Sequence, residues 1–170
     1  DLNGVRLRNR IVFSSSSFEY GRKPWEDWLI RPERAGAVTT RTLTVQPREG
    51  HLRTILRPWD VVRKIHGGWL NAVGLRNIGI DRYIREEYPK THHVNRIVSI
   101  HGFTLDEWGV LIDKLNPLDG IAAIELNLSC PNVEHIPGDD IPAIVRLVRA
   151  RTHHPLIAKL SADMAYVTLA

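Results

Sequence analysis

Short apolar runs recur along the chain and alternate with segments whose apolar residues follow a helical period. Apolar runs of a few residues bounded by polar ones are typical of buried strands, whereas spacings of three and four residues are typical of helices. We predict five core strands and one edge strand on this basis, at residues 11–13, 37–44, 97–100, 121–130 and 156–160, with the edge strand at 5–8. Strand–helix alternation predicts parallel strands joined by right-handed crossovers.

The clearest predicted helix follows the strand at 97–100. Thr104 and Glu107 have the spacing of a capping box, and apolar residues follow at helical intervals. A second helix is expected to begin at Asp139 or Asp140. The expected buried faces are Trp108, Leu111, Ile112 and Leu115 in the first helix and Ile141, Ile144, Val145 and Val148 in the second. Two further helices are expected, with Trp25, Trp28 and Leu29 on one, and with Asp81 as the cap and Ile84 and Tyr88 buried on the other. Residues 46–68 show no clear period and predict a long loop.

Each predicted strand ends in polar residues, which places candidate chemistry at the carboxyl ends of the strands. TIM barrels and doubly wound sheets both carry their sites there. The first strand is not followed by Gly-x-Gly-x-x-Gly, which favours the barrel. A TIM barrel has eight strand–helix units. We therefore predict an α/β fold, a single domain over 1–170 that corresponds to about the first five units of a barrel.

Composition narrows the class of protein. The chain has 170 residues, 43% hydrophobic and 25% charged, which is typical of a soluble globular domain. Its net charge of +4 comes from scattered basic residues without long runs, so nucleic-acid binding is not expected. One cysteine excludes an internal disulfide and fits a reducing compartment. No apolar run approaches the ~18 residues that span a bilayer, so we expect a cytoplasmic protein that does not bind membranes. The sequence opens at Asp1 rather than at a methionine.

Candidate chemistry gathers where the apolar run 121–124 gives way to polar residues. Asn127, Ser129, Cys130 and Asn132 follow it, and Pro131 cannot donate to a sheet ladder, so the strand is expected to end at Cys130. Two carboxamides can fix a planar polar ligand, and a thiol can act as base or nucleophile. An ordinary polar turn with an inert cysteine is the alternative.

The octet Glu125-Leu126-Asn127-Leu128-Ser129-Cys130-Pro131-Asn132 resembles the Asn-Leu-Ser-Cys-Pro-Asn signature of the dihydroorotate dehydrogenases, in the soluble class with a cysteine base. The resemblance implies an FMN-dependent oxidoreductase of pyrimidine biosynthesis. By it, Cys130 is the general base that takes a proton from carbon five of dihydroorotate, and carbon six delivers hydride to the flavin N5. No metal is expected.

Two segments near the start of the chain also resemble that family. Residues 9–21 resemble its first-strand segment, which implies that Ser14 and Ser15 contact FMN, and Ser16 stands where the family has glycine. Thr40-Arg41-Thr42 resembles a Thr-Lys-Ser motif. The resemblance implies that Arg41 and Thr42 contact FMN and that Arg41 also binds the substrate, with arginine in place of lysine.

The remaining contacts are implied by later motifs. Residues 71–77 match the family's Asn-Ala-x-Gly-Leu-x-Asn, and Lys159 matches a lysine beside the pyrimidine side of the flavin. The substrate contacts implied are Asn71, Val73, Gly74, Leu75, Asn127 and Asn132, and the further FMN contacts are Ser99, Asn127 and Lys159.

Several alternatives stay open at this point. One alternative is another FMN barrel enzyme, either a related dihydropyrimidine dehydrogenase or a tRNA-dihydrouridine synthase. The synthases also have an Asn-x-x-Cys-Pro element, although the full octet and residues 71–77 argue against them. An inactive fragment is the third possibility, because the family's glycine-rich phosphate loops are not in the chain, and we expect the isolated chain to bind flavin poorly. The full-length protein is expected to be a homodimer. An electron-transfer subunit, and fumarate or NAD as acceptor, remain open.

Overall fold

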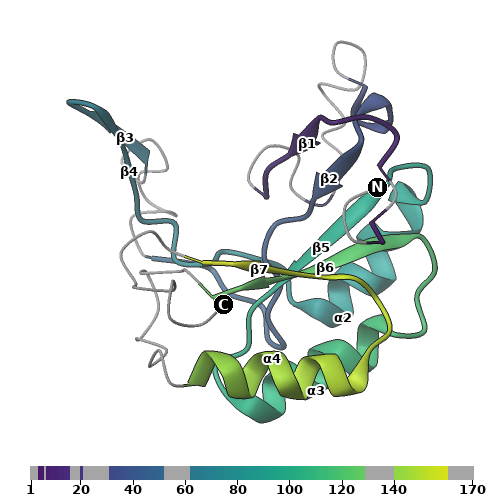
Figure 1. The fold of residues 1–170 in the computed structure, drawn as a ribbon. Helices are drawn as coiled ribbons and strands as arrows, with labels where there is room; N and C mark the ends of the chain where they lie inside the picture. The colour runs from purple at the N-terminus through teal and green to yellow at the C-terminus, as the bar shows by residue number, and fades with distance from the viewer. Residues whose placement is uncertain are drawn as a thin grey trace.

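The structure is a computed structural model that describes residues 4, 5, 7–15, 20, 31–51, 62–128 and 140–160. Five parallel strands form one sheet in the order β1-β2-β5-β6-β7, and β3 and β4 form a separate antiparallel hairpin (Figure 1). The strands are β1 (Val12–Phe13), β2 (Ala37–Thr39), β3 (Val62–Ile65), β4 (Gly68–Asn71), β5 (Arg96–Ile100), β6 (Ile121–Asn127) and β7 (Leu156–Lys159). The helices are α2 (Ile80–Arg82), α3 (Leu105–Leu115) and α4 (Asp140–Arg151). The described residues also form 3-10 turns at Pro32–Arg34 and Tyr88–Thr91 and a π turn at Tyr83–Glu87.

The strand order follows the chain order without a reversal among the described strands. A doubly wound sheet reverses its order at a switch point, whereas a barrel adds each strand to the same side of the last. The order therefore agrees with the predicted barrel. No helix in the described ranges is both long and apolar enough to cross a membrane.

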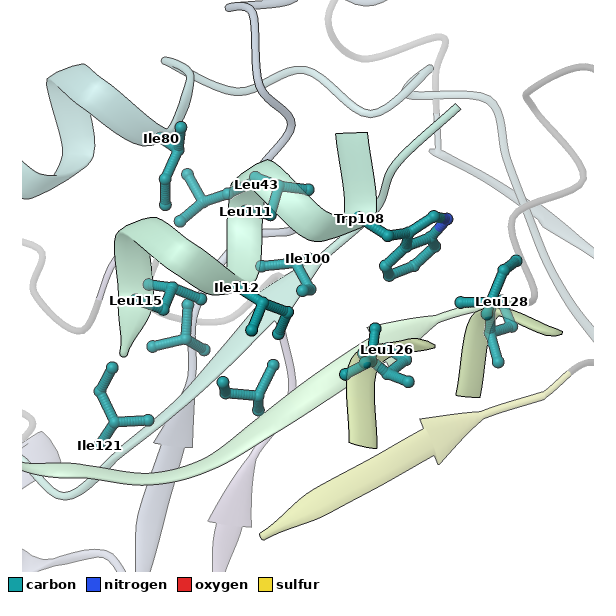
Figure 2. Packing of buried hydrophobic residues seen from close by; sticks show 14 of the residues in the cluster. Leu43, Ile80, Ile100, Trp108, Leu111, Ile112, Leu115, Ile121, Leu126 and Leu128 are labelled. Atoms are coloured by element: carbon teal, nitrogen blue, oxygen red, sulfur yellow. The ribbon is translucent and has the colours of Figure 1, made fainter. Parts of the chain in front are cut away.

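One face of the sheet packs against the helices. Val98 and Ile100 of β5 pair in register with Ile124 and Leu126 of β6, and all four are buried. Figure 2 shows the apolar side chains of α3 packed over these strands. The predicted α3 residues, all at most 1% exposed, are Trp108, Leu111, Ile112 and Leu115. In α4, Ile141, Ile144 and Val148 are buried and Val145 is partly buried, which confirms the predicted face.

The other face of the sheet changes character along the strands. A small cluster containing Ala37, Ile97 and Ala123 lies toward their amino ends. Because successive residues of a strand alternate between faces, Ser99, Glu125 and Asn127 follow on the same face as Ile97 and Ala123. The strands thus carry apolar residues at one end and polar residues at the other, on the face opposite the helices.

The capping box predicted for α3 is present. Glu107 N–H donates to Thr104 Oγ1 over 3.2 Å, and Phe103 N–H donates to Glu107 Oε2 over 2.7 Å. The reciprocal bond thus reaches the residue before the cap. It satisfies a donor that would otherwise be left open at the start of the helix.

The edges of the sheet differ from the prediction. The segments at 11–13 and 156–160 were expected to be buried, but Ile11 is 61% exposed and Val12 and Leu160 are also exposed. β1 and β7 lie at the two edges of the described sheet, so each pairs with a single neighbour there. Val5 forms an isolated bridge and not an edge strand. β2 ends at Thr39 and not at residue 44, after which Leu43 makes an isolated bridge to Ile100.

The segment between β2 and β5 holds two further differences. The predicted loop at 46–68 runs into the hairpin of β3 and β4, which projects from the body in Figure 1. Asp81 does not cap the next helix: the cap position is Gly79 at φ +77°, whose N–H donates to Asn77 Oδ1 over 2.8 Å. Ile80 and Tyr83 are the fully buried residues there, whereas Ile84 and Tyr88 are partly buried. The predicted helix around 25–29 lies outside the described residues.

β6 ends earlier than expected. The strand was predicted to run to Cys130, but it ends at Asn127. The Leu128 N–H donates to the carbonyls of Leu126, at 3.1 Å, and Lys159, at 3.0 Å. A bond to a carbonyl two residues back is a tight local turn. Leu128 therefore forms a tight turn at the end of β6 while its N–H still bonds to β7.

Candidate active site

The predicted residues that meet in the structure lie at the carboxyl ends of four strands. Thr42 follows β2, Ser99 is in β5, and Asn127 and Lys159 are the last residues of β6 and β7. Asn127 and Lys159 are direct partners in the register of β6 and β7, and Ser99 is paired with Glu125 in the register of β5 and β6. Parallel pairing alone therefore places residues from distant parts of the sequence at one edge of the sheet.

These side chains form a continuous hydrogen-bonded chain. Asn127 Nδ2 donates to Thr42 Oγ1 over 2.9 Å, and Thr42 Oγ1 lies 2.9 Å from Ser99 Oγ. Ser99 Oγ is in turn 2.8 Å from Glu125 Oε1. Thr42, Ser99 and Asn127 are each at most 5% exposed, so these bonds are shielded from water. Buried polar groups require such partners, because an unpaired one costs about 1–3 kcal/mol.

Lys159 brings positive charge to the open end of this chain. Its Nζ lies 3.9 Å from Glu125 Oε1, with the lysine side chain 39% exposed and the glutamate side chain 13% exposed. The pair is long for an ion pair, and its lysine is partly solvated, so its contribution to stability is small. What it does supply is a cation whose ammonium group reaches both the carboxylate and solvent.

His101 is buried directly behind Asn127. It is 1% exposed, and its Nδ1 lies 2.8 Å from the Asn127 carbonyl oxygen. The ring also packs edge-on against Phe103 and Trp108. Burial lowers the pKa of His101 below its usual value and the charge of Arg48 lowers it further, while the bond to Asn127 opposes them. The imidazole is therefore held neutral.

The predicted substrate segment at 71–77 is fixed by its last residue. Asn77 Nδ2 donates to the Leu75 carbonyl over 2.7 Å and to Thr44 Oγ1 over 3.0 Å. Gly74 and Leu75 both have positive φ, at +72° and +55°. Positive φ is uncommon for leucine, and such residues persist only where their surroundings hold them. Asn77 supplies that restraint, which shapes the backbone that was predicted to line the substrate site.

The other predicted residues fall into two groups. Ser14 and Ser15 follow β1 and Arg41 follows β2, so they lie after carboxyl ends of the same sheet, whereas Asn71 ends the exposed hairpin. The Arg41 side chain is half-buried and has no hydrogen bond or ion pair in the part of the chain that the structure describes. Cys130 and Asn132 lie outside the described residues.

A surface hollow of about 430 Å³ lies elsewhere on the molecule. It is formed around the amino ends of β5 and β6, and its lining residues are Leu7, Arg8, His92, His93, Val94, Asn95 and Gly120. None of the predicted site residues lines it. The hydrogen-bonded side chains at the carboxyl ends, rather than this hollow, are the candidate active site.

Comparison with known proteins identifies the family. A family model described as dihydroorotate dehydrogenase matches residues 1–169. The chain belongs to the dihydroorotate dehydrogenase family. This confirms the resemblance carried by the octet at 125–132.

Several curated relatives of the chain carry the name of a catalytic subunit. Proteins named dihydroorotate dehydrogenase B (NAD(+)), catalytic subunit, from Geotalea uraniireducens and Geotalea daltonii are each 39% identical to the chain over 175 residues, which cover 98% of it and 55% of each relative. The same-named protein of Geobacter sulfurreducens is 35% identical over 172 residues. The chain spans about half the length of the curated relatives it matches.

A solved structure supports the fold. The crystal structure of DHODH from Eimeria tenella in complex with ferulenol has a TM-score of 0.59 and 15% identity, and the match covers 91% of this chain and 50% of that one. The predicted α/β barrel, represented here by five of its strands, is thereby confirmed.

Two residues of the candidate active site were not among those predicted from motifs. Glu125 links Ser99 to Lys159, and His101 supports the carbonyl of Asn127. A carboxylate within the apolar run of β6 was a usable signal for Glu125, because a charge in a buried strand requires partners. No local pattern marked His101, since its partner is 26 residues away in the sequence.

Proposed function

We propose that the protein containing this chain oxidises dihydroorotate to orotate with FMN as its cofactor. Residues 1–170 would form a single domain that makes up the amino-terminal portion of the FMN-binding barrel. The observation that carries the proposal is the buried chain of side chains at the strand ends, in which Asn127 is held in place by Thr42 while Lys159 supplies a cation. An amide and a cation side by side suit a planar, electron-accepting ring with a polar edge.

The described residues fit FMN in charge as well as in position. Lys159 is partly exposed, and Arg41 has no ion-pair partner in the described ranges, so both cations are available to a ligand. In this proposal Ser14, Ser15, Thr42, Ser99 and Asn127 hold the flavin with them. When bound, FMN supplies the two-electron acceptor that amino acid side chains lack.

The chain's own residues bind the substrate and move its proton. Arg41 is proposed to hold the substrate carboxylate, for which its planar pair of donors is well suited. The proposed polar contacts around the ring are Asn71, Asn127, Asn132 and the backbone of Val73, Gly74 and Leu75. Cys130 takes the proton from carbon five, while the hydride leaves carbon six, so the substrate loses one proton and one hydride. A free thiol has a pKa of about 8.5, so Cys130 requires a pocket that favours its thiolate.

The relatives' name suggests the electron acceptor. Those proteins are named as NAD(+)-linked catalytic subunits, and we propose that this protein likewise passes electrons to NAD through a partner subunit. We further propose a homodimer of catalytic subunits in the cytoplasm.

The decisive experiment is to add dihydroorotate anaerobically to the full-length protein loaded with FMN and to record the flavin spectrum. Rapid bleaching of the flavin band supports the proposal. The Cys130→Ala variant should bind FMN with unchanged affinity yet bleach at least about 100-fold more slowly, because general-base catalysis contributes 10²–10⁴-fold.

A matched variant separates binding from chemistry. Arg41→Met should raise the KM for dihydroorotate by about tenfold or more, since a bond to a charged group contributes about 1.5–3 kcal/mol, and Arg41→Lys should recover most of that loss. FMN-loaded protein that dihydroorotate does not bleach would refute the proposed substrate.

A further inference from the structure

The hydrogen bonds that link the polar side chains at the strand ends all run in one donor-to-acceptor direction. This direction is determined by the number of hydrogens that each side chain can donate. We propose that Glu125 is a positioning residue whose carboxylate, acting through the hydroxyls of Ser99 and Thr42, fixes which end of the Asn127 carboxamide faces the ligand. The inference rests on the proposed function only in taking Asn127 as a ligand contact. The hydrogen-bonded chain itself stands on the distances between its members.

The direction follows from Glu125. An ionised carboxylate only accepts hydrogen bonds, so Ser99 must donate its single hydroxyl hydrogen to Glu125 Oε1, 2.8 Å away. The contact of 2.9 Å between Ser99 and Thr42 then needs the hydrogen of Thr42. Thr42 therefore has only lone pairs left for Asn127, which must present its Nδ2–H to Thr42 Oγ1, as it does at 2.9 Å.

The opposite orientation of the amide leaves one contact without a hydrogen. If Asn127 turned its oxygen toward Thr42, the single hydrogen of Thr42 would be needed by both Asn127 and Ser99. One buried pair of oxygens would then face each other at about 3 Å without a bond, at the cost of an unsatisfied buried group. An ionised Glu125 thus selects one of the two amide orientations from three residues away along the hydrogen-bonded chain.

Lys159 lies beside Glu125, at the start of the hydrogen-bonded chain. Its ammonium lies 3.9 Å from the same Oε1 atom that accepts from Ser99. The cation and the hydrogen-bonded chain therefore meet at one carboxylate oxygen of Glu125.

The direction of the hydrogen bonds also limits how the hydroxyls of Thr42 and Ser99 can bind a ligand. The hydrogens of Thr42 and Ser99 are both used inside the chain, so each hydroxyl can only accept from a ligand and cannot donate to it. Asn127 is the last residue of the hydrogen-bonded chain that begins at Glu125. Its orientation is consequently the property that Glu125 controls.

The first test needs no flavin. In the intact protein labelled with ¹⁵N-asparagine, the side-chain NH₂ of Asn127, assigned by its loss in Asn127→Asp, should exchange slowly with solvent. Ser99→Ala frees the hydrogen of Thr42 and allows both orientations, so this exchange should accelerate by about tenfold, the scale of one hydrogen bond. Thr42→Val should accelerate it likewise, and Thr42→Ser should restore the slow rate. Unchanged exchange in both Ser99→Ala and Thr42→Val would overturn the inference.

The second test separates the inference from the proposed function. Glu125→Met should weaken orotate binding to the FMN-loaded protein by about fivefold to tenfold, whereas Glu125→Gln, which keeps an acceptor for Ser99, should recover most of the affinity. If the unsubstituted protein takes up no FMN, the proposed function fails and the exchange rates alone decide the inference. If FMN and orotate bind and Glu125→Met binds orotate as tightly as the parent, the inference fails and the proposed function stands.

Discussion

Acid should destabilise the protein through His101. The Asn127 carbonyl can only accept, so His101 Nδ1 carries the hydrogen of their 2.8 Å bond and the neutral ring has none on Nε2. Nε2 is buried and has no hydrogen-bond partner in the described structure. Protonation would add a donor there without an acceptor, together with a charge beside Phe103 and Trp108. The lowered pKa of His101 expresses this cost.

The sign and size of the effect follow from proton linkage. The unfolded chain binds a proton at His101 near the ordinary pKa of about 6.5, whereas the native state resists it, so stability falls as the pH drops below that value. One such proton gives a slope of at most about 1.4 kcal/mol per pH unit. Because the unfolded histidine is only half protonated at its pKa, we expect the free energy of unfolding to fall by up to about 1 kcal/mol between about pH 6.5 and 5.5.

Urea unfolding followed by tryptophan fluorescence, from about pH 7.5 to about 5.5, measures this slope. His101→Phe keeps a ring in the site and should remove most of the slope. His101→Asn places an amide N–H where Nδ1 was, so it should remove the slope while keeping the bond to Asn127. His154 also has a pKa lowered by burial, but it is only half-buried, and His154→Gln should change the slope less. A slope in His101→Phe equal to that of the parent would refute this reasoning.

Three further substitutions test how the elements around the site are held. Thr104→Ala should cost about 1 kcal/mol in urea unfolding by removing the cap of α3, whereas Thr104→Ser should be nearly neutral. Gly74→Ala should lower the free energy of unfolding by about 1–3 kcal/mol. Gly74 has a φ of +72°, and a Cβ at this position would lie 2.7 Å from His51 N. Arg96→Met, similar in size, should cost about 2 kcal/mol by the same measurement, because the buried guanidinium donates to the Tyr88 carbonyl and to Thr91 Oγ1. A change within about 0.5 kcal/mol, as for ordinary surface substitutions, would contradict each expected loss.

The unit formed by β5 and α3 could be predicted from sequence because its signals are local. Thr104 and Glu107 lie three residues apart, and the buried residues of α3 repeat at helical spacing. The start of the preceding helix could not be predicted in this way. Gly79 is held by the side chain of Asn77, which also bonds to Thr44, 33 residues earlier. The first helical N–H, that of Ile80, donates to the Thr44 carbonyl over 3.0 Å. A helix start held by a distant segment has no pattern in the local sequence, and the prediction of Asp81 as the cap was therefore wrong.

The edge strands and the hairpin could not be predicted from their local sequence either. The run at 11–13 is as apolar as that of a central strand, and only its place in the sheet decides that Ile11 is exposed. In β3, two basic residues separate the exposed Val62 and Ile65, and in β4 the exposed Trp69 and Leu70 are adjacent. Neither strand therefore shows the alternation that identifies a buried face. Turn geometry and pairing between β3 and β4 define this hairpin, and neither is visible in either strand alone.

Four of the predicted site residues meet at the strand ends because the strands that carry their motifs pair in the right register. Glu125 joins them, and the face on which it lies depends on the register of β6. Ile124 and Leu126 face the helices, while Glu125 and Asn127 face away from them, so a slip of one residue would exchange the two sets. Such a slip would bury the carboxylate of Glu125 against α3 and would expose Leu126. The cost of burying an unpaired charge far exceeds that of exposing one leucine. The residue that orients Asn127 in the proposed mechanism therefore also discriminates against the wrong pairing of the strand that carries it.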